Sequence, residues 1–332
     1  MSEKKPIITV KGLKTHFPVK GTKKVVRAVD GVDLVVYEGE TLGVVGESGC
    51  GKTTLGKSIL QLIRPTAGEC IYEFEDGPAD LCKMSYRELD KARRELQIVF
   101  QDPQSSLNPS FTVYQSMSDP LKKFGLKTKA ERRKRVGDLL EEVNMQREYM
   151  DRYPSEFSGG QRQRIGIARA LSINPRVVVC DEAVSALDVS IQAQVLNLMN
   201  DLKKERGLTY IFISHDMSVI EYISDRIVVM YLGKIMEIAD AETLYKRSVH
   251  PYTQALLSAI PVADVDHVKN RILLEGDVPS PINVPSGCRF HTRCKYCQQI
   301  CKEKEPELKT YIEDGKEHMV ACHFSDKAFE ND

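Results

Sequence analysis

A glycine-rich loop between an apolar strand and a helix is the feature that most constrains the fold of this chain. The loop reads Gly46-Glu-Ser-Gly-Cys-Gly-Lys52-Thr53 and fits the phosphate-binding pattern G-x-x-x-x-G-K-[ST] in full. The apolar run Leu42–Val45 before it predicts a strand, and the segment Thr53–Arg64 after it reads as a helix. Glycines let backbone N–H groups turn toward phosphate oxygens beside a helix N-terminus, which favours negative charge. The sequence therefore predicts an α/β fold of the P-loop NTPase class.

The order of the other predicted elements agrees with this fold. Short β-branched runs at residues 7–10, 25–29 and 32–36 precede the loop. From Gln161 onward, a helix, the strand Val177–Cys180, a second helix and the strand Thr209–Ile213 alternate. This alternation predicts a mostly parallel sheet whose ligands bind at the carboxyl ends of its strands.

A helical insertion is predicted between these α/β segments. Val136, Leu139, Leu140 and Val143 recur at helical spacing within residues 111–157. A basic run covers residues 127–135, and we interpret it as the solvated face of a helix rather than as a nucleic-acid site.

Bulk composition is that of an ordinary globular protein. Lys and Arg total 47, as do Asp and Glu, so no overall charge recruits nucleic acid or an anionic membrane. No run approaches the roughly 20 apolar residues that span a bilayer, and the first residues lack the apolar stretch of a signal peptide. Any membrane-spanning work is therefore expected from partner chains.

Two adjacent carboxylates follow a strand of four apolar residues. Asp181 and Glu182 would be costly there unless a Mg²⁺–phosphate site partners them. We expect Asp181 to hold Mg²⁺ through water, Thr53 to ligate it, and Lys52 to lie between the β- and γ-phosphates. Glu182 is expected to orient and deprotonate the attacking water, a role worth about 10²–10⁴-fold in rate. Cys50, inside the loop, is interpreted as a tolerated small residue in preference to a redox-sensitive thiol.

The string Ser158-Gly-Gly-Gln161, about twenty residues before that strand, narrows the class. Together with the loop and the Asp-Glu pair, it resembles the signature of the ATP-binding-cassette (ABC) ATPases. A serine hydroxyl and glycine N–H groups at a helix start form an anion site that cannot easily serve the same nucleotide as the phosphate loop. In the resembled family this surface meets ATP on the opposite subunit, which implies a dimer with shared sites.

The same resemblance assigns further site residues. Gln101 matches the family's Q-loop, which contacts magnesium and water and faces the membrane partner, and His215 matches the switch histidine at the γ-phosphate. Phe17 corresponds to the aromatic residue that stacks on adenine, with a place in the core or beside Tyr37 as alternatives. The resemblance implies that the nucleotide is bound by these residues: Phe17, Gly46, Glu47, Ser48, Gly49, Cys50, Gly51, Lys52, Thr53, Thr54, Gln101, Ser158, Gly160, Gln161, Asp181 and Asp188.

Longer strings narrow the resemblance to the ATPase subunits of oligopeptide and dipeptide ABC importers, a group with nickel-transporting relatives. These strings are residues 100–109, 156–165, 250–257 and 287–294, and the likeness covers roughly residues 5–325. Phe157 and Ala183 depart from the commoner Leu and Pro, and neither replaces a phosphate-contacting position. The resemblance implies a peripheral protein on the cytoplasmic face of the plasma membrane. It pairs with a second ATPase subunit, expected to give a heterodimer, and acts with two permeases and an extracytoplasmic binding protein.

The alternative class is a soluble ABC ATPase acting on ribosomes or DNA. Only about a hundred residues separate the loop from the signature, and they lack the heptads of a long coiled coil, which disfavours the kind that acts on DNA. The chain holds a single cassette, which disfavours the kind that acts on ribosomes. We place an ABC ATPase domain at residues 5–260, with a helical subdomain at about 106–160. A cysteine-rich extension follows at 261–332.

Five of the nine cysteines crowd the last 45 residues of the chain. Without an export signal, a metal or cluster site is favoured over disulfides. In the resembled importers, a 4Fe–4S cluster is held at the positions of Cys288, Cys294, Cys301 and Cys322. From spacing alone zinc competes, because Cys294, Cys297 and Cys301 resemble a knuckle with His323 as a fourth ligand. Unliganded thiols are the third alternative. Cys297 distinguishes the cluster from the zinc site, because only the zinc site needs this residue as a ligand.

Overall fold

The computed structural model describes residues 4–102, 106–260, 271–313 and 315–329, which divide into two compact units. The first unit comprises residues 1–36, 41–82 and 214–332, and the second comprises 37–40 and 83–213. The first therefore contains the phosphate loop together with the cysteine-rich C-terminal region. Residues 103–105 of the predicted string 100–109 lie outside the described residues.

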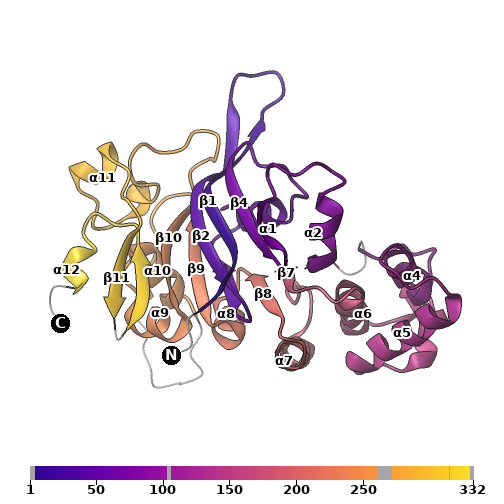
Figure 1. The fold of residues 1–332 in the computed structure, drawn as a ribbon. Coiled ribbons are helices and arrows are strands. Elements are labelled where there is room, and N and C mark those ends of the chain that lie inside the picture. The colour runs from indigo at the N-terminus through magenta and orange to yellow at the C-terminus, as the bar shows by residue number, and fades with distance from the viewer. Residues whose placement is uncertain (1–3, 103–105, 261–270, 314, 330–332) are drawn as a thin grey trace. The chain divides into compact units, whose positions relative to one another are not determined.

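The first unit contains an antiparallel arrangement of N-terminal strands (Figure 1). The order is β2-β1-β4-β5, and β4 pairs antiparallel with both β1 and β5. These strands are β1 (Pro6–Pro18), β2 (Val25–Tyr37), β4 (Ala67–Phe74) and β5 (Gly77–Asp80). The prediction of two strands at 25–29 and 32–36 is wrong, because Gly31 adopts a left-handed φ of 78° that lets one strand continue through it.

A second set of strands in this unit carries the phosphate loop. Its order is β11-β12-β10-β9-β3, with β3 parallel to β9 and the other pairs antiparallel. The strands are β3 (Thr41–Val45), β9 (Arg226–Tyr231), β10 (Lys234–Asp240), β11 (Lys309–Glu313) and β12 (Lys316–Val320). The C-terminal region thus extends the strands that begin at the loop.

Helices of the first unit flank these strands. They are α1 (Lys52–Ile59), α8 (Met217–Ile223), α9 (Ala241–Arg247), α10 (Pro251–Ser258), η3 (His291–Arg293), α11 (Gln299–Glu303) and α12 (Asp326–Phe329). The helix predicted to reach Arg64 ends at Ile59, and Gln61 follows with a left-handed φ of 55°.

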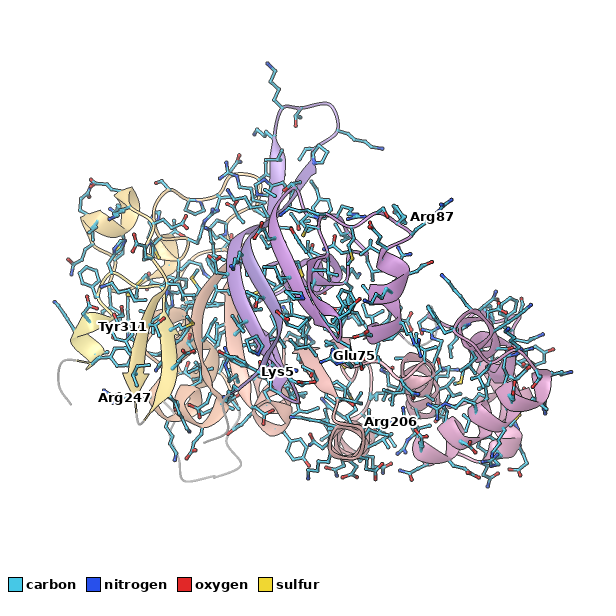
Figure 2. All side chains as sticks on the ribbon, in the orientation of Figure 1. Lys5, Glu75, Arg87, Arg206, Arg247 and Tyr311 are labelled. Atoms are coloured by element: carbon cyan, nitrogen blue, oxygen red, sulfur yellow. The ribbon has the colours of Figure 1, made fainter. Side chains whose placement is uncertain are left out.

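Ring stacking and hydrogen bonds hold the C-terminal residues in place. The ring of Tyr311 stacks on Phe329 with 3.9 Å between centroids, and its hydroxyl donates to Asp326. Arg247 donates to the carbonyl of Ala328 at 2.8 Å, and both Tyr311 and Arg247 are labelled in Figure 2. These contacts attach α12 to the rest of the first unit.

The second unit contains three parallel strands in the order β8-β7-β6. They are β6 (Leu96–Val99), β7 (Val177–Asp181) and β8 (Thr209–Ile213), accompanied by α2 (Leu89–Glu95), α6 (Gly159–Leu171) and α7 (Val189–Arg206). Every residue of β7 and β8 is buried, as expected of parallel strands covered on both faces. The predicted strands Val177–Cys180 and Thr209–Ile213 are confirmed.

The predicted helical insertion is also confirmed in this unit. It comprises α4 (Val113–Lys123), α5 (Lys129–Glu142), η1 (Arg147–Asp151) and η2 (Pro154–Glu156). Capping boxes at Thr112 and Thr128 start α4 and α5. Lys127, Lys129 and Lys134 of the basic run are exposed. Within the described part of the chain, no helix is both long and apolar enough to cross a membrane.

Candidate functional site

The phosphate loop has a backbone that only glycine can follow at two positions. Gly46 follows β3 and has a φ of 154°, and a Cβ there would lie 2.2 Å from the carbonyl oxygen of Met230. Gly51 has a φ of 106°, and a Cβ there would lie 2.0 Å from the carbonyl oxygen of Ala28. Gly51 precedes α1, and no side chain caps the start of this helix. A phosphate bound in the loop could therefore accept hydrogen bonds from the backbone of the first turn, which contains Thr53 and Thr54.

Lys52 lies over the loop itself. Its side chain is buried, and Nζ donates to the carbonyl oxygens of Gly46 at 2.7 Å and Glu47 at 3.1 Å. Neutral carbonyls are weaker partners for an ammonium than anionic oxygens are. A phosphate entering the loop would therefore offer Lys52 a stronger hydrogen-bond partner.

Cys50 is a buried residue of the same loop. Its Sγ lies 3.9 Å from Lys52 Nζ, yet burial raises the pKa of the thiol more than the lysine lowers it. Since the thiolate is the reactive species, this environment disfavours a redox-sensitive Cys50. The structure thus agrees with the interpretation of Cys50 as a tolerated small residue.

Two further predicted site residues belong to the first unit. Phe17, near the end of β1, is 37% exposed, which excludes the alternative that it is a core residue. His215 is exposed and follows Ser214, whose N–H donates to the carbonyl of Val44 at 3.1 Å. Since Val44 is in β3, this bond places the His215 segment beside the strand that leads into the phosphate loop.

In the second unit, Gln101 and Glu182 are brought together. Gln101 Nε2 donates to Glu182 Oε2 at 2.8 Å. Glu182 has a left-handed φ of 48°, and its N–H donates to the carbonyl of Ile213 at 2.9 Å. Such backbone strain in a non-glycine residue clusters at functional sites. Asp181, directly before it, is 4% exposed at the end of β7.

The signature string starts α6. Ser158 accepts from the N–H of Gln161, whose side-chain oxygen accepts from the N–H of Ser158 in return. Gly160 packs closely, because a Cβ there would lie 2.5 Å from Ile191 Cγ2. Phe157 is buried, and its ring packs edge-on against Tyr149 with 5.6 Å between centroids. The phenylalanine found here in place of the commoner leucine therefore has a packing role.

Asp188 caps a helix in the structure. Its Oδ1 accepts from the N–H of Ile191 at 3.1 Å and from Ser190 Oγ at 3.1 Å, which fixes the start of α7. Ala183 is fully buried.

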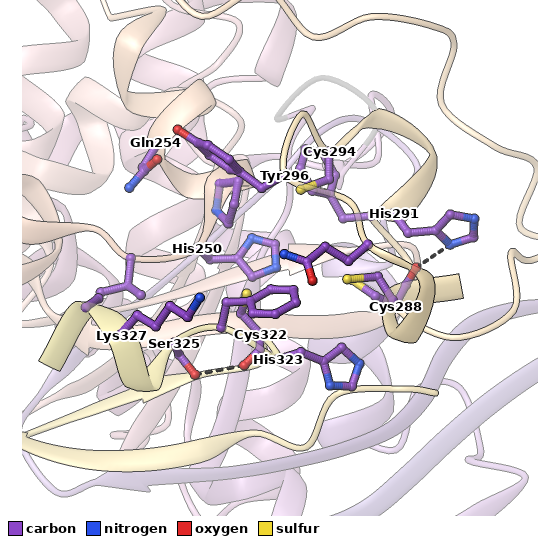
Figure 3. Close-up of a pocket in the computed structure, with 17 residues that line it drawn as sticks. His250, Gln254, Cys288, His291, Cys294, Tyr296, Cys322, His323, Ser325 and Lys327 are labelled. Atoms are coloured by element: carbon purple, nitrogen blue, oxygen red, sulfur yellow. Dashed lines mark hydrogen bonds between the residues drawn. The ribbon is translucent and has the colours of Figure 1, made fainter. Parts of the chain in front are cut away.

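The four cysteines of the cluster prediction line one pocket of about 420 Å³ in the first unit (Figure 3). Burial is the largest cause that raises the pKa of Cys288, which reaches about 12 with smaller contributions from the nearby thiols of Cys301, Cys322 and Cys294. Cys297 does not line the pocket, and its Sγ points to the carbonyl of Gln298 at 3.6 Å. His323 lines the pocket but its Nε2 bonds to the carbonyl oxygen of Lys304 at 2.8 Å.

The part of the chain that the structure describes contains no preformed site for a single metal ion. Among the described residues, no three His, Cys, Asp or Glu side chains lie close enough together to hold one metal ion. The four thiols that line the pocket are of the donor type that a 4Fe–4S cluster uses, but the described residues form no metal-binding group.

Two contacts to the phosphate loop were not predicted from the sequence. The carboxylate of Glu47 pairs with Arg293, and the N–H of Glu47 donates to Tyr252 Oη at 2.9 Å. Both partners occur in the C-terminal strings 250–257 and 287–294, but spacing alone does not show what a side chain contacts.

Comparison with known protein families gives two matches. Residues 29–185 match the family described as ABC transporter. Residues 236–301 match the family described as oligopeptide/dipeptide transporter, C-terminal region. The second match covers Arg293 and the first three cysteines of the pocket.

Curated relatives match nearly the whole chain. A putative oligopeptide transport ATP-binding protein, YkfD of Bacillus subtilis, is 51% identical over 321 residues, covering 96% of this chain and 95% of that protein. The oligopeptide transport ATP-binding protein AppF of Bacillus subtilis is 49% identical over 325 residues, covering 96% and 97%.

Solved structures share the fold. The dimeric, post-hydrolysis form of the ATP-binding cassette MJ0796, bound to ADP and Pi, is 29% identical, with a TM-score of 0.62. It covers 71% of this chain and 99% of its own. CbiO1 of Clostridium perfringens, part of the ABC transporter complex cbiONQ, is 26% identical with a TM-score of 0.63, covering 74% and 92%. These matches confirm the predicted ABC ATPase fold class.

Proposed function

This chain belongs to the family of ATP-binding subunits of oligopeptide ABC transporters, and we propose that its ATP hydrolysis drives the import of peptides through separate membrane subunits. The observation that carries the proposal is the match of residues 236–301, which lie beyond the residues 29–185 that match the ABC transporter family, to a region named for oligopeptide and dipeptide transporters. This match favours the transporter over an ABC ATPase that acts on ribosomes or DNA.

The proposed partners follow from the resemblance and the relatives. The chain would pair with a second ATPase subunit, as a heterodimer, at the cytoplasmic face of the membrane. Two permeases would form the channel, and an extracytoplasmic binding protein would deliver the peptide. Oligopeptide cargo is supported by the names of the relatives, with dipeptides and nickel as the competing cargoes.

We assign the chemical steps to the residues as follows. Lys52 and the loop N–H groups would bind the phosphates of ATP, and Phe17 would stack on adenine. Thr53, Asp181 and Gln101 offer a hydroxyl, a carboxylate and an amide oxygen, which are the oxygen donors that Mg²⁺ prefers. Mg²⁺ would neutralise charge on the phosphates.

The attacking water would be handled by Glu182. The Gln101 amide N–H bonded to Glu182 Oε2 fixes the carboxylate, and it leaves the amide oxygen of Gln101 as the atom that can ligate a cation. Glu182 would accept the proton of the water, and His215 would contact the γ-phosphate. Ser158, Gly160 and Gln161 would contact the ATP bound by the partner subunit, and Asp188 would lie close to that nucleotide.

Transport in a reconstituted system tests the function. Proteoliposomes that contain the two permeases and the second ATPase, with the binding protein outside, should accumulate labelled oligopeptide only when ATP is present on the side of the ATPases. Lys52→Ala should abolish uptake, because the phosphates lose their cation. Uptake of nickel but not of peptide would overturn the proposed cargo, and co-purification with ribosomes instead of permeases would overturn the transporter assignment.

We further propose that Cys288, Cys294, Cys301 and Cys322 hold a 4Fe–4S cluster, supported by the pocket that these four thiols line. The cluster would act as a cross-link in a region poor in apolar residues. Anaerobically purified protein should be brown with absorbance near 400 nm. Cys294→Ser should lose the colour, while Cys297→Ser, the matched control, should keep it. Colourless protein with stoichiometric zinc would contradict the proposal.

A further inference from the structure

The segment between Cys288 and Cys294 contacts the phosphate loop through an ion pair. Arg293 Nη1 donates to Glu47 Oε2 at 2.7 Å, and Nη2 donates to Glu47 Oε1 at 3.2 Å. The Arg293 side chain is only 8% exposed and that of Glu47 is 26% exposed. A bidentate, largely desolvated pair of this kind fixes both the position and the orientation of the carboxylate.

The backbone of Glu47 is held from the same region. Its N–H donates to Tyr252 Oη at 2.9 Å, and the Tyr252 ring packs against Phe290 with 5.3 Å between centroids. Both rings are almost completely buried. Arg293 Cζ lies 6.0 Å from the centroid of Tyr231, whose ring is 4.8 Å from that of Tyr252, so both residues that hold Glu47 contact one aromatic cluster.

A second arginine of the segment anchors it near the base of the loop. Arg289 Nη2 donates to Asp30 Oδ2 at 2.6 Å, and both side chains are buried. The N–H of Asp30 donates to the carbonyl of Gly233, whose own N–H donates to the carbonyl of Cys50 in the loop. Residues 288–294 thus contact the loop directly and through a short chain of hydrogen bonds.

The charge of Glu47 gives this contact a consequence for nucleotide binding. Glu47 is the second residue of a loop that binds a triphosphate, so an unpaired carboxylate there would repel the ligand. Pairing with Arg293 neutralises that carboxylate and keeps it turned toward the C-terminal region.

We propose that Arg293 is a positioning residue for ATP, which it favours by neutralising and orienting Glu47 of the phosphate loop. The affinity of the loop for ATP then depends on the C-terminal segment that the two cysteines bracket. The inference goes beyond the transport function and requires only that the loop binds ATP.

A rescue experiment tests the proposal on the full-length protein. The dissociation constant of a fluorescent ATP analogue is measured with Mg²⁺ for the wild type, Arg293→Met, Glu47→Gln and the double variant. Arg293→Met should raise this constant about tenfold, because a carboxylate beside the phosphates becomes unpaired. Adding Glu47→Gln to Arg293→Met should bring the constant back to within about threefold of the wild type, because the repelling charge is gone.

Controls separate this role from a general effect on folding. Lys295→Met removes an exposed cation two residues away and should leave the constant unchanged. Arg293→Lys, which keeps the charge but loses the bidentate geometry, should weaken binding less than Arg293→Met and serves as the second background if Arg293→Met fails to fold. A double variant that binds as weakly as Arg293→Met, or an Arg293→Met protein with wild-type affinity, would overturn the inference alone. A wild-type protein that binds no ATP would overturn the proposed function as well.

Discussion

At the scale of single residues, backbone conformation restricts which amino acid can occupy key positions of the site. Gly46 and Gly51 accommodate close approaches by Met230 and Ala28, while Glu182 carries a left-handed backbone that glycine would adopt at lower cost. This conformation costs about 1–3 kcal/mol, and such strain clusters at functional sites, which agrees with the role proposed for the Glu182 carboxylate.

Gly51→Ala should destabilise the protein more than Gly49→Ala. Both residues have positive φ, so both substitutions carry a similar conformational cost, but only at Gly51 does the new Cβ meet a backbone atom, 2.0 Å away. We expect a reduction in the free energy of unfolding at Gly51 that exceeds the one at Gly49 by about 1–3 kcal/mol. Urea denaturation of the nucleotide-free variants measures the difference, and equal midpoints would contradict the geometry of the loop.

At the scale of elements, the sequence predicted the local order well. The phosphate loop, β7 and the helical insertion follow from patterns within a few residues of one another, such as an apolar run before a glycine turn. The ion pair between Glu47 and Arg293 joins residues far apart in the sequence, and no periodicity in the sequence reveals it. The prediction of two strands instead of β2 failed because Gly31 continues the strand with a left-handed φ of 78°.

The start of α10 should make stability depend on pH. His250 caps this helix by accepting the N–H of Tyr252, and burial lowers the pKa of its imidazole to about 4 from 6.5. Between these values the unfolded chain binds a proton that the folded chain excludes. The contribution of neutral His250 to stability is therefore complete above pH 6.5 and is lost as the pH falls toward 4, by at most about 1.4 kcal/mol per pH unit.

His250→Asn keeps a capping side chain and removes the titration. The free energy of unfolding of the wild type, relative to this variant, should fall between pH 6.5 and 4.5. Parallel pH profiles for the two proteins would show that His250 is not the titrating group.

At the scale of the whole molecule, the proposed function gives one chain two anion-binding surfaces, the phosphate loop and the start of α6. The solved dimeric cassette MJ0796, which has the same fold, was captured with ADP and Pi. The division of the chain at residue 260 remains a prediction, whereas the structure groups residues 214–332 with the phosphate loop in one compact unit.

Mixing two inactive variants tests whether ATP sites are shared between subunits. In a homodimer of this chain, Lys52→Ala disables the loop and Ser158→Ala disables the signature, so a mixed dimer has one site with both defects and one with neither. The mixture should recover part of the ATPase activity that each variant lacks alone. A mixture without any recovery would argue against sharing, as would recovery of the full wild-type rate.

Glu182→Gln tests the central claim most directly, because it changes one oxygen of the proposed base to nitrogen and keeps the shape of the side chain. ATP turnover and the oligomeric state with Mg²⁺–ATP are measured together, by phosphate release and by light scattering. We predict that turnover falls by about 10²-fold or more while ATP stays bound and a closed dimer accumulates. A Glu182→Gln protein that releases phosphate at the wild-type rate would contradict the assignment of Glu182 as the base and, with it, the account of this ATPase site.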